Sequence, residues 1–461
     1  MKSPLLQQVL KLALPVAMQS VLVSLLGMSD VFMVTGLGAA SVAAIGLGAK
    51  LHFVLIMVMA SFGSAISVLV AQYHGRGNKS ATQAVLTLGN VAGLLLLLPI
   101  AVAFFAFPRQ LLMLLSDDAQ MIALGVNYLR LTVPLLFFTH IIISFESALR
   151  SRGETMTPLI LSSVAIVMNI VLNYCFIHGV GPFPALGVAG VAIASDLARL
   201  VQVALLLMYL SRHSHTFALG NLIASASDIR RYVPKFFKTA WPLTVNFTVW
   251  GVGTFVYHGV AAKVGTNALA SLSLISPIES LYHSLFFGLV TACSVMVGQN
   301  LGRDDFDMAS LLAKRFTLYA PIGSLLVGVL ILAASPLFLP LLLEPGSELY
   351  VLCSQLLWVM CLTFWIKVYN MTLIVGVLRA GGDSKYVLGV DMVSMWMLSI
   401  PAVIIGAFVF ELNYVWVYAL VLVEEVVKAS LITLRARKKF WLRNLTSDME
   451  DQSSIALQAA A

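Results

Sequence analysis

The chain has 461 residues, of which 60% are hydrophobic and only 11% charged, and its mean hydropathy is +0.94. This balance excludes a soluble globular domain and is typical of a polytopic helical membrane protein. The net charge of +7 does not indicate a nucleic-acid partner, because the basic residues fall in particular loops. The lipid bilayer is therefore the first partner that the composition predicts.

Residues that often carry enzyme or cofactor chemistry are sparse. The cysteines lie in apolar runs without a metal-binding spacing, and we interpret them as packing residues (Cys175, Cys293, Cys353 and Cys361). The sequence contains no glycine-rich nucleotide motif of the GxxxxGK(S/T) type. We therefore expect neither an enzyme nor a bound cofactor, and we expect an ion gradient to drive any transport.

The apolar runs predict the fold class. A bilayer core requires about 20 apolar residues in a helix. Runs of that length or longer predict an all-α polytopic membrane protein with twelve transmembrane helices, at roughly 7–34, 42–72, 84–107, 121–148, 156–178, 186–211, 231–262, 269–300, 311–335, 349–378, 384–410 and 414–436.

The first run carries two unusual residues. Pro15 cannot donate a hydrogen bond to the carbonyl of Lys11, so the helix is weakened there and we interpret this proline as a hinge. Asp30 lies within the same span, where an ionised carboxylate is costly, so it is a candidate functional residue. The competing interpretation of Pro15 is a purely architectural bend.

The basic residues indicate the orientation. With the N-terminus inside the cell, the alternate connections that face the cytoplasm hold most of the lysines and arginines, as the positive-inside rule requires. The same counting places both termini in the cytoplasm. These residues include Arg76, Lys79, Arg150, Arg152, Arg230, Arg231, Lys235, Lys238, Arg303, Lys314, Arg315, Arg379 and Lys385.

An internal repeat divides the chain. A spacing of 227 residues relates Pro15 to Pro242, and the segments 67–78 and 294–305 share the same spacing without a gap. Later, LRSRGET at 149–155 matches LRAGGDS at 378–384 at a spacing of 229. Because each half has an even number of helices, both enter from the same side and are related by a pseudo-twofold along the membrane normal. We predict an N-lobe at 1–212, a cytoplasmic linker at 213–230, a C-lobe at 231–440 and a flexible cytoplasmic tail at 441–461.

Several motifs make the chain resemble the multidrug and toxic compound extrusion (MATE) family over about residues 7–440. They are VAQYHGRGN and VGQNLGRDD after the second and eighth helices, ALRSRGETMTP, and MNIVLNYCFI in the fifth helix. The resemblance implies a pair of lobes that export organic, often cationic compounds in exchange for protons or sodium ions. It is greatest to the bacterial branch whose coupling acid lies on the first helix.

The resemblance also implies a coupling site. The positions that match the family's acid and its helix-5 and helix-6 partners are Asp30, Asn169, Asn173 and Asp196. Asn169 and Asn173 share one helix face because they are four residues apart. Amides can donate to a carboxylate or accept from a carboxylic acid, so the site tolerates both protonation states. Carboxylate and amide oxygens would also suit Na⁺ at these four residues. The plainer interpretations are interhelical hydrogen bonding by the asparagines and an ion pair between Asp196 and Arg199.

The second half offers further polar candidates. Position 257, which corresponds to Asp30 in the repeat, is a tyrosine, so coupling is expected to be asymmetric. Glu279, His283 and Lys367 are the second-rank candidates, with a neutralised Glu279–His283 or Glu279–Lys367 pair as the alternative. Asp391 is predicted to be interfacial. Glu424 with Lys428, and Glu146 with Arg150, are each four residues apart and are predicted to be internal pairs.

The function that these patterns favour is secondary active export of drug-like, cationic or amphipathic compounds, by alternating access and in exchange for protons. Sodium coupling is the first alternative, and a flippase for lipids or lipid-linked oligosaccharides of the same superfamily is the second. A channel or receptor without coupled transport would not require the repeat or the intramembrane acid. We expect a monomer in the bacterial inner membrane.

Overall fold

The computed structural model describes residues 4–113, 118–213, 215–224 and 229–447. All regular secondary structure in these segments is helical. Ten of the helices in these segments are long and apolar enough to cross a membrane. The chain is therefore an all-helical polytopic membrane protein, as predicted. The two remaining predicted spans correspond to α10 (Ile229–Val264), which is long but less apolar, and to the shorter helices α16 (Tyr414–Leu420) and α17 (Leu422–Arg437).

The helices of these segments form two compact units. Unit 1 comprises residues 1–17, 71–77 and 241–461, and unit 2 comprises residues 18–70 and 78–240. Three helices contribute to both units: α1 (Pro4–Val34), α2 (Ala39–Gly75) and α10.

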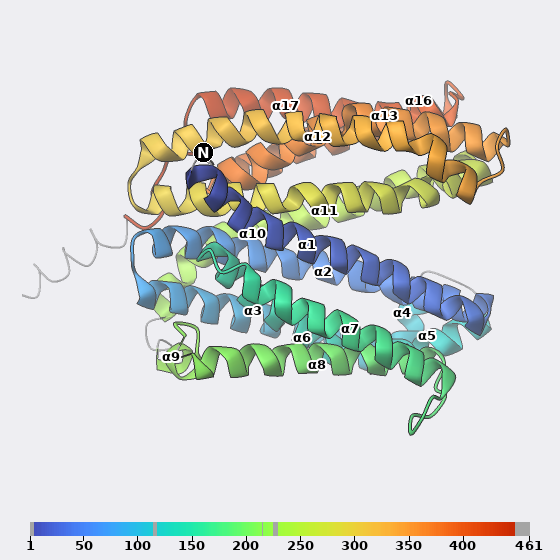
Figure 1. Ribbon diagram of the computed structural model, residues 1–461, viewed down its shortest axis with the longest axis horizontal. Helices are drawn as coiled ribbons and strands as arrows, with labels where there is room; N and C mark the ends of the chain where they lie inside the picture. Colours follow the sequence, from blue (N-terminus) through green and yellow to red (C-terminus); the bar gives the residue numbers. More distant parts are fainter. Residues whose placement is uncertain (1–3, 114–117, 214, 225–228, 448–461) are drawn as a thin grey trace, which may run out of the picture. The chain divides into compact units, whose positions relative to one another are not determined.

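Unit 2 is a bundle of long helices. Its helices α7 and α8 run side by side, as do α3 and α6 (Figure 1). Besides its parts of α1, α2 and α10 it contains α3 (Lys79–Ala106), α4 (Pro108–Met113), α5 (Ala119–Leu131), α6 (Val133–Ser151), α7 (Met156–His178), α8 (Val188–Arg212) and α9 (Leu219–Ala224).

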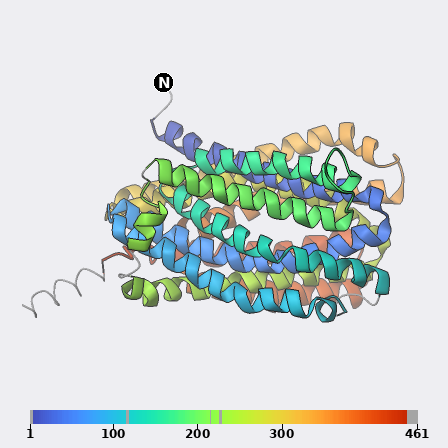
Figure 2. The ribbon, with the colours of Figure 1, turned by 90° about the horizontal axis from the view of Figure 1, so that it is seen from below.

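Unit 1 is also a bundle, in which α11, α12 and α13 pack on one another and α17 packs on α13 (Figure 1). The long helices appear again, seen from below, in Figure 2. Its remaining elements are α11 (Thr266–Gly302), α12 (Phe306–Leu342), α13 (Glu348–Met371), η3 (Thr372–Leu378), α14 (Ser384–Asp391), η4 (Met392–Ser399), α15 (Ile400–Phe408), α16 and α17.

Three predicted spans are interrupted. The span predicted at 121–148 is broken at Thr132, between α5 and α6, because Pro134 has no N–H to donate to the carbonyl of Arg130. In unit 1, η3 follows α13 and η4 separates α14 from α15, and both are π-helical turns. Such turns are rare and occur often at functional sites, because they insert a residue and re-aim the side chains beyond them.

Two repeated prolines lie close to the points where helices pass from one unit to the other. Residues 4–17 of α1 belong to unit 1, whereas the rest of α1 belongs to unit 2. Residues 229–240 of α10 belong to unit 2, whereas the rest of α10 belongs to unit 1. Pro15 and Pro242 lie within three residues of these crossings. Both helices continue through the proline, so neither predicted bend interrupts the helix.

The repeated motifs at the ends of α2 and α11 contact each other reciprocally within unit 1. A Cβ atom on Gly75 would overlap the carbonyl oxygen of Gln299, and a Cβ atom on Gly302 would overlap the carbonyl oxygen of Gln72. Each glycine therefore permits an approach that no other residue could make without moving the opposite backbone. The 227-residue spacing relates Gly75 to Gly302 and Gln72 to Gln299, so each contact is the repeat counterpart of the other.

The described part of the predicted tail packs on the same motifs of unit 1. Leu445 donates its backbone N–H to Gln72 Oε1 at 2.6 Å, and Thr446 Oγ1 accepts from Arg76 at 2.9 Å. Asn444 donates to Asp304 at 2.8 Å. The Trp441 side chain is 3% exposed. Residues 441–447 are thus part of the packed unit, and the rest of the predicted tail lies outside the described residues.

The predicted linker also makes contacts, all of them within unit 2. His215 and Glu154 are joined at 2.8 Å, and Phe217 is fully buried. The Arg152 guanidinium lies over the Phe217 ring. Residues 225–228 and residue 214 of this linker lie outside the described residues.

Candidate functional site

Asp30 lies in a hydrogen-bonded cluster with both predicted asparagines. Asn173 on α7 donates to Asp30 Oδ1 at 2.8 Å and to Asn169 Oδ1 at 3.0 Å. Asn169 in turn donates to Ser195 Oγ on α8 at 3.2 Å. Asn169 and Asn173 are 4% and 0% exposed. The one-turn spacing of the asparagines therefore brings the acid of α1 and the hydroxyl of α8 into one polar chain.

Asp196 lies beside Ser195 but has different contacts. It interacts with the backbone N–H of Leu135 in the first turn of α6, where Thr132 makes no side-chain cap. A carboxylate at this position satisfies a free N–H group and faces the positive end of the helix. Among the described residues no hydrogen bond joins Asp196 to Asp30, Asn169 or Asn173, so these three come together and Asp196 has a separate partner.

Two buried acceptor atoms of these residues have no hydrogen-bond partner among the described residues. They are Asn173 Oδ1 and Asp196 Oδ1. Buried polar atoms of native proteins are almost always paired, so two orphaned acceptors indicate a site that accepts a donor or a cation. Tyr128 on α5 is buried and lies within electrostatic range of both Asp30 and Asp196. Nothing in the sequence near Tyr128 indicates that it is a neighbour of the two acids.

A second buried network in unit 2 surrounds Glu146 of α6. Gln19 of α1 donates to Glu146 Oε2 at 2.9 Å and to Ser162 Oγ at 2.7 Å. Ser162 on α7 and Gln202 on α8 donate to Glu146 Oε1 at 3.0 and 3.3 Å. Arg150 completes the predicted ion pair with Glu146 at 3.3 Å. Four helices thus converge on one carboxylate, and Gln19 ties the part of α1 just after Pro15 into it.

Arg199 does not pair with Asp196. Its guanidinium donates to Gln202 Oε1 at 2.9 Å, three residues further along α8. The alternative of a simple intrahelical Asp196–Arg199 pair is therefore not observed. Arg199 remains within electrostatic range of both Glu146 and Asp30.

Two of the three second-rank candidates of unit 1, Glu279 and Lys367, form the neutralised pair that was predicted as an alternative. Lys367 Nζ lies 2.5 Å from Glu279 Oε1 and also lies over the Phe364 ring. The His283 side chain is exposed and stacks on Phe287. Glu279 is therefore neutralised by Lys367 rather than by His283.

Asp391, which was predicted to be interfacial because it follows Lys385 closely, is 5% exposed inside unit 1. Lys428 Nζ lies 2.8 Å from Asp391 Oδ1 and 2.8 Å from Glu424 Oε1, so the predicted Glu424–Lys428 pair is confirmed and extended. Asn246 donates to Asp391 Oδ2 at 2.5 Å.

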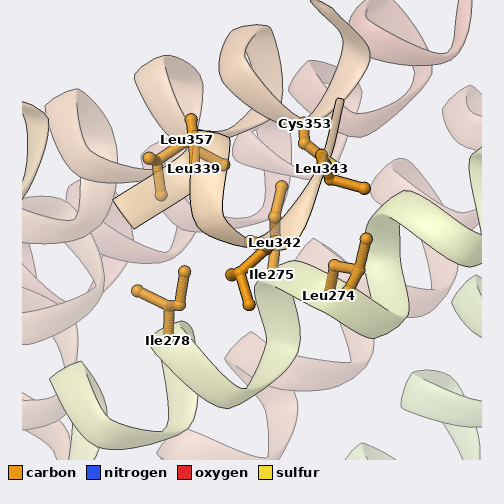
Figure 3. Close-up of a pocket in the computed structure, with 8 residues that line it drawn as sticks. All are labelled: Leu274, Ile275, Ile278, Leu339, Leu342, Leu343, Cys353 and Leu357. Carbon is orange, nitrogen blue, oxygen red and sulfur yellow. The ribbon is translucent and has the colours of Figure 1, made fainter. Parts of the chain in front are cut away.

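The structure also contains an apolar pocket in unit 1 between α11, α12 and α13 (Figure 3). It encloses about 280 Å³ of empty space, part of it open to the surroundings. Leucine, isoleucine and cysteine side chains line it: Leu274, Ile275, Ile278, Leu339, Leu342, Leu343, Cys353 and Leu357 (Figure 3). Without a polar group to orient a ligand, this pocket offers no chemistry comparable to the Asp30 cluster. The described residues also contain no group of three His, Cys, Asp or Glu side chains that could hold a metal ion.

Comparison with known proteins identifies the family. The family model described as MatE matches residues 15–175 and 242–405. The chain belongs to the MATE family of membrane transporters. The two matched segments begin at Pro15 and Pro242, at the spacing of the internal repeat.

Relatives and solved structures agree with this assignment. "Probable multidrug resistance protein YoeA" of Bacillus subtilis is 25% identical to this MATE protein over 79% of each chain. A structure of a mutant of the Vibrio cholerae MATE transporter VcmN has a TM-score of 0.85 at 18% identity, covering 96% of this chain and 99% of that one. An outward-facing MATE transporter of the MOP superfamily has a TM-score of 0.84 at 18% identity, covering 96% of each chain. The fold is therefore that of MATE transporters, and this MATE protein is a transporter rather than an enzyme.

Proposed function

We propose that this MATE protein is a secondary active multidrug exporter that moves cationic or amphipathic organic compounds out of the cytoplasm in exchange for protons. The names of its relatives support the substrate class, because YoeA and the NorM protein of Vibrio vulnificus are named for multidrug resistance. The proposal places this protein in the bacterial inner membrane as a monomer with both termini in the cytoplasm. The two repeat halves, 1–212 and 231–440, act as its lobes.

The observation that carries the proposal is the Asp30–Asn173–Asn169 chain, in which the buried Asn173 Oδ1 has no hydrogen-bond partner among the described residues. A protonated Asp30 can donate to a buried acceptor, whereas an ionised Asp30 can only accept. The local hydrogen bonds must therefore rearrange whenever the proton arrives or leaves. Because Asp30 is on α1, this rearrangement acts directly on the helix that contains Pro15.

The proposed cycle follows from that coupling. Proton uptake by Asp30 from the external side changes its bonds to Asn173 and thereby to Asn169, with Asp196 as the neighbouring acid. The part of α1 beyond Pro15 then repacks within its own unit and displaces the bound compound. Proton release toward the cytoplasm restores the first arrangement. A difference of one pKa unit between the two states supplies about 1.4 kcal/mol, so modest shifts suffice to drive the change.

Sodium is the second candidate for the coupling ion. The carboxylate of Asp30, the free oxygens of Asn173 and Asp196, and Asn169 offer the oxygen ligands that hard cations prefer. A flippase for lipids or lipid-linked oligosaccharides is the other alternative. It would require cations that hold a phosphate group, and Arg199, which lies within electrostatic range of Asp30, is engaged with Gln202.

The test is efflux of a fluorescent cation from proteoliposomes after a pH jump or, separately, a sodium jump. We expect the pH jump to drive efflux in the wild type, and Asp30→Asn to abolish it while the protein still inserts. Glu344→Gln is the matched control, because Glu344 is an exposed acid of unit 1 whose side chain makes no hydrogen bond within the part of the chain that the structure describes. Equal efflux by Asp30→Asn would refute the proposed site, and efflux driven only by sodium would refute proton coupling.

A further inference from the structure

The repeat duplicates a buried polar network as well as the motifs at 67–78 and 294–305. Gln19 and Asn246 are 227 residues apart, and each is four residues after its repeated proline. Three further pairs are 229 residues apart: Arg150 and Arg379, Ser162 and Asp391, and Arg199 and Lys428. The members of each set lie together in their own unit, around Glu146 in unit 2 and around Asp391 in unit 1.

The two networks share one plan. In each, the amide of the repeat's first helix donates to a buried carboxylate: Gln19 to Glu146 at 2.9 Å, and Asn246 to Asp391 at 2.5 Å. In each, an arginine of the LRxxG motif completes the contact. Arg150 pairs with Glu146, whereas Arg379 donates to Asn246 Oδ1 at 2.6 Å.

The networks differ in where the cation of the sixth helix points. In unit 2, Arg199 bonds to Gln202 and makes no ion pair with Asp30 or Asp196 among the described residues. In unit 1, the equivalent Lys428 lies 2.8 Å from each of two carboxylates, Asp391 and Glu424. Its side chain is 7% exposed, so this ammonium group is held inside the protein.

Unit 1 also contains a counterpart of the Asp30 cluster itself. Tyr257 occupies the position of Asp30 in the repeat; its hydroxyl donates to Glu424 Oε2 at 2.8 Å and also lies within hydrogen-bond distance of Ser399 Oγ, at 2.9 Å. Glu424 lies within one residue of the repeat position of Asp196, and Ser399 within one residue of that of Asn169. Unit 1 thus has an acid on the last helix of the repeat, as unit 2 does, but a tyrosine in place of the first-helix acid, and Glu424 is paired with Lys428.

We infer that unit 1 retains a monovalent-cation site whose occupant is the Lys428 ammonium group. This inference rests on the proposed function of the Asp30 cluster, whose counterpart it describes. One carboxylate oxygen of Asp391 and one of Glu424 each lie 2.8 Å from the ammonium nitrogen, and carboxylate oxygens are also the ligands that hard cations prefer. Because the lysine cannot leave, this site does not respond to the ion gradient, in contrast to the proposed site at Asp30.

Removal of the ammonium group should open the site to a diffusible cation. In Lys428→Met, Asp391 and Glu424 lose the cation that lies 2.8 Å from each of them, and Arg379 remains as a cation within electrostatic range of Asp391. Removal of one partner of a buried ion pair is strongly unfavourable. Sodium that binds the folded protein stabilises it by mass action. We expect the melting temperature of Lys428→Met to rise by roughly 2 °C when NaCl replaces choline chloride at equal ionic strength.

The measurement is made in an Asp30→Asn background, so that the Asp30 cluster contributes no sodium response. Lys428→Arg retains a cation and should show no difference between the two salts. The double change Lys428→Met with Glu424→Gln loses a ligand and should lose the sodium response. If the melting temperature of Lys428→Met is the same in NaCl and in choline chloride, the inference is contradicted, because any effect of salt would then reflect charge screening alone.

Recovery of the protein gives a second readout. If sodium can replace the ammonium, Lys428→Met and Lys428→Gln should be recovered in better yield in NaCl than in choline chloride. Failure of both variants to fold in NaCl overturns the inference. The proposed function is judged by the efflux assay on Asp30→Asn alone, so the two can fail separately.

Discussion

The carboxylate of Asp30 and the amide of Asn173 are joined by a 2.8 Å hydrogen bond between α1 and α7. The same amide nitrogen donates to Asn169, one turn earlier on α7. The fully buried Asn173 is therefore the residue through which the acid of α1 is linked to the rest of unit 2.

Replacement of Asn173 by alanine should lower efflux while the pH jump is unchanged. A hydrogen bond to a charged group contributes about 1.5–3 kcal/mol, so we expect a loss of roughly tenfold or more in the rate. The measurement is pH-driven efflux from proteoliposomes. Asn221→Ala removes an exposed asparagine of α9 and should leave the rate unchanged. A normal rate in Asn173→Ala would show that Asp30 acts without this partner.

The Glu146 network should be the most sensitive polar site of unit 2. Glu146→Ala leaves the donors of Gln19, Ser162, Gln202 and Arg150 without their shared acceptor. Breaking a buried charged network typically costs about 3–5 kcal/mol. We expect a clear fall in melting temperature in detergent. Glu279→Ala, at a side chain that is 27% exposed, should have a smaller effect, and the reverse order would contradict this ranking.

Gly75 and Gly302 should not tolerate a methyl group. Gly75→Ala and Gly302→Ala each place a Cβ atom onto an opposite backbone carbonyl, which cannot rotate away as a side chain can. We expect each variant to lower the melting temperature by an amount that corresponds to about 1–3 kcal/mol, as overpacking does. Gly389→Ala is the control, since a Cβ atom there meets nothing within 4 Å. That change should be neutral or slightly stabilising because alanine favours the helix.

Removal of the Trp441 side chain should lower the melting temperature more than removal of the nearby Arg443 side chain. Trp441 is 3% exposed, so Trp441→Ala removes a large buried side chain, a change that costs about 3–5 kcal/mol in well-packed cores. Arg443 is 54% exposed on its side chain and lies 3.5 Å from Asp383. An exposed pair of this kind contributes little, so Arg443→Ala should change the melting temperature only slightly. Equal effects would mean that the segment binds through charge rather than through packing.

Much of the fold could be predicted from the sequence because its causes are local or periodic. Long apolar runs predict the spans, and the fixed 227-residue spacing identifies the repeat without any knowledge of packing. The resemblance to the MATE family implied the grouping of Asp30 with Asn169 and Asn173, and the four-residue spacing placed the two asparagines on one helix face. The predictions of the spans and of the repeat depended on patterns along the chain alone.

The misses concern residues whose partners come from other helices. Gln19 is a single polar residue in an apolar run, and nothing near it in the sequence shows that Glu146 and Ser162 converge on it. The prediction for Asp391 counted residues from Lys385 along the chain and did not identify the charge partner Lys428, which comes from another helix. The repeat contained a further indication of these contacts that the predictions did not use. The spacing that relates Pro15 to Pro242 also relates Gln19 to Asn246, and two buried amides at one repeat position indicate a shared contact.

The reciprocal contact of Gly75 with Gln299 and of Gly302 with Gln72 has the form of an isologous interface, in which one patch meets an identical patch across a twofold axis. A six-helix ancestor that paired with its own copy would have made this contact twice from a single coding sequence. In such a homodimer every acid appears twice. A chain that carries both halves is free of that constraint, and here position 30 is an aspartate whereas position 257 is a tyrosine.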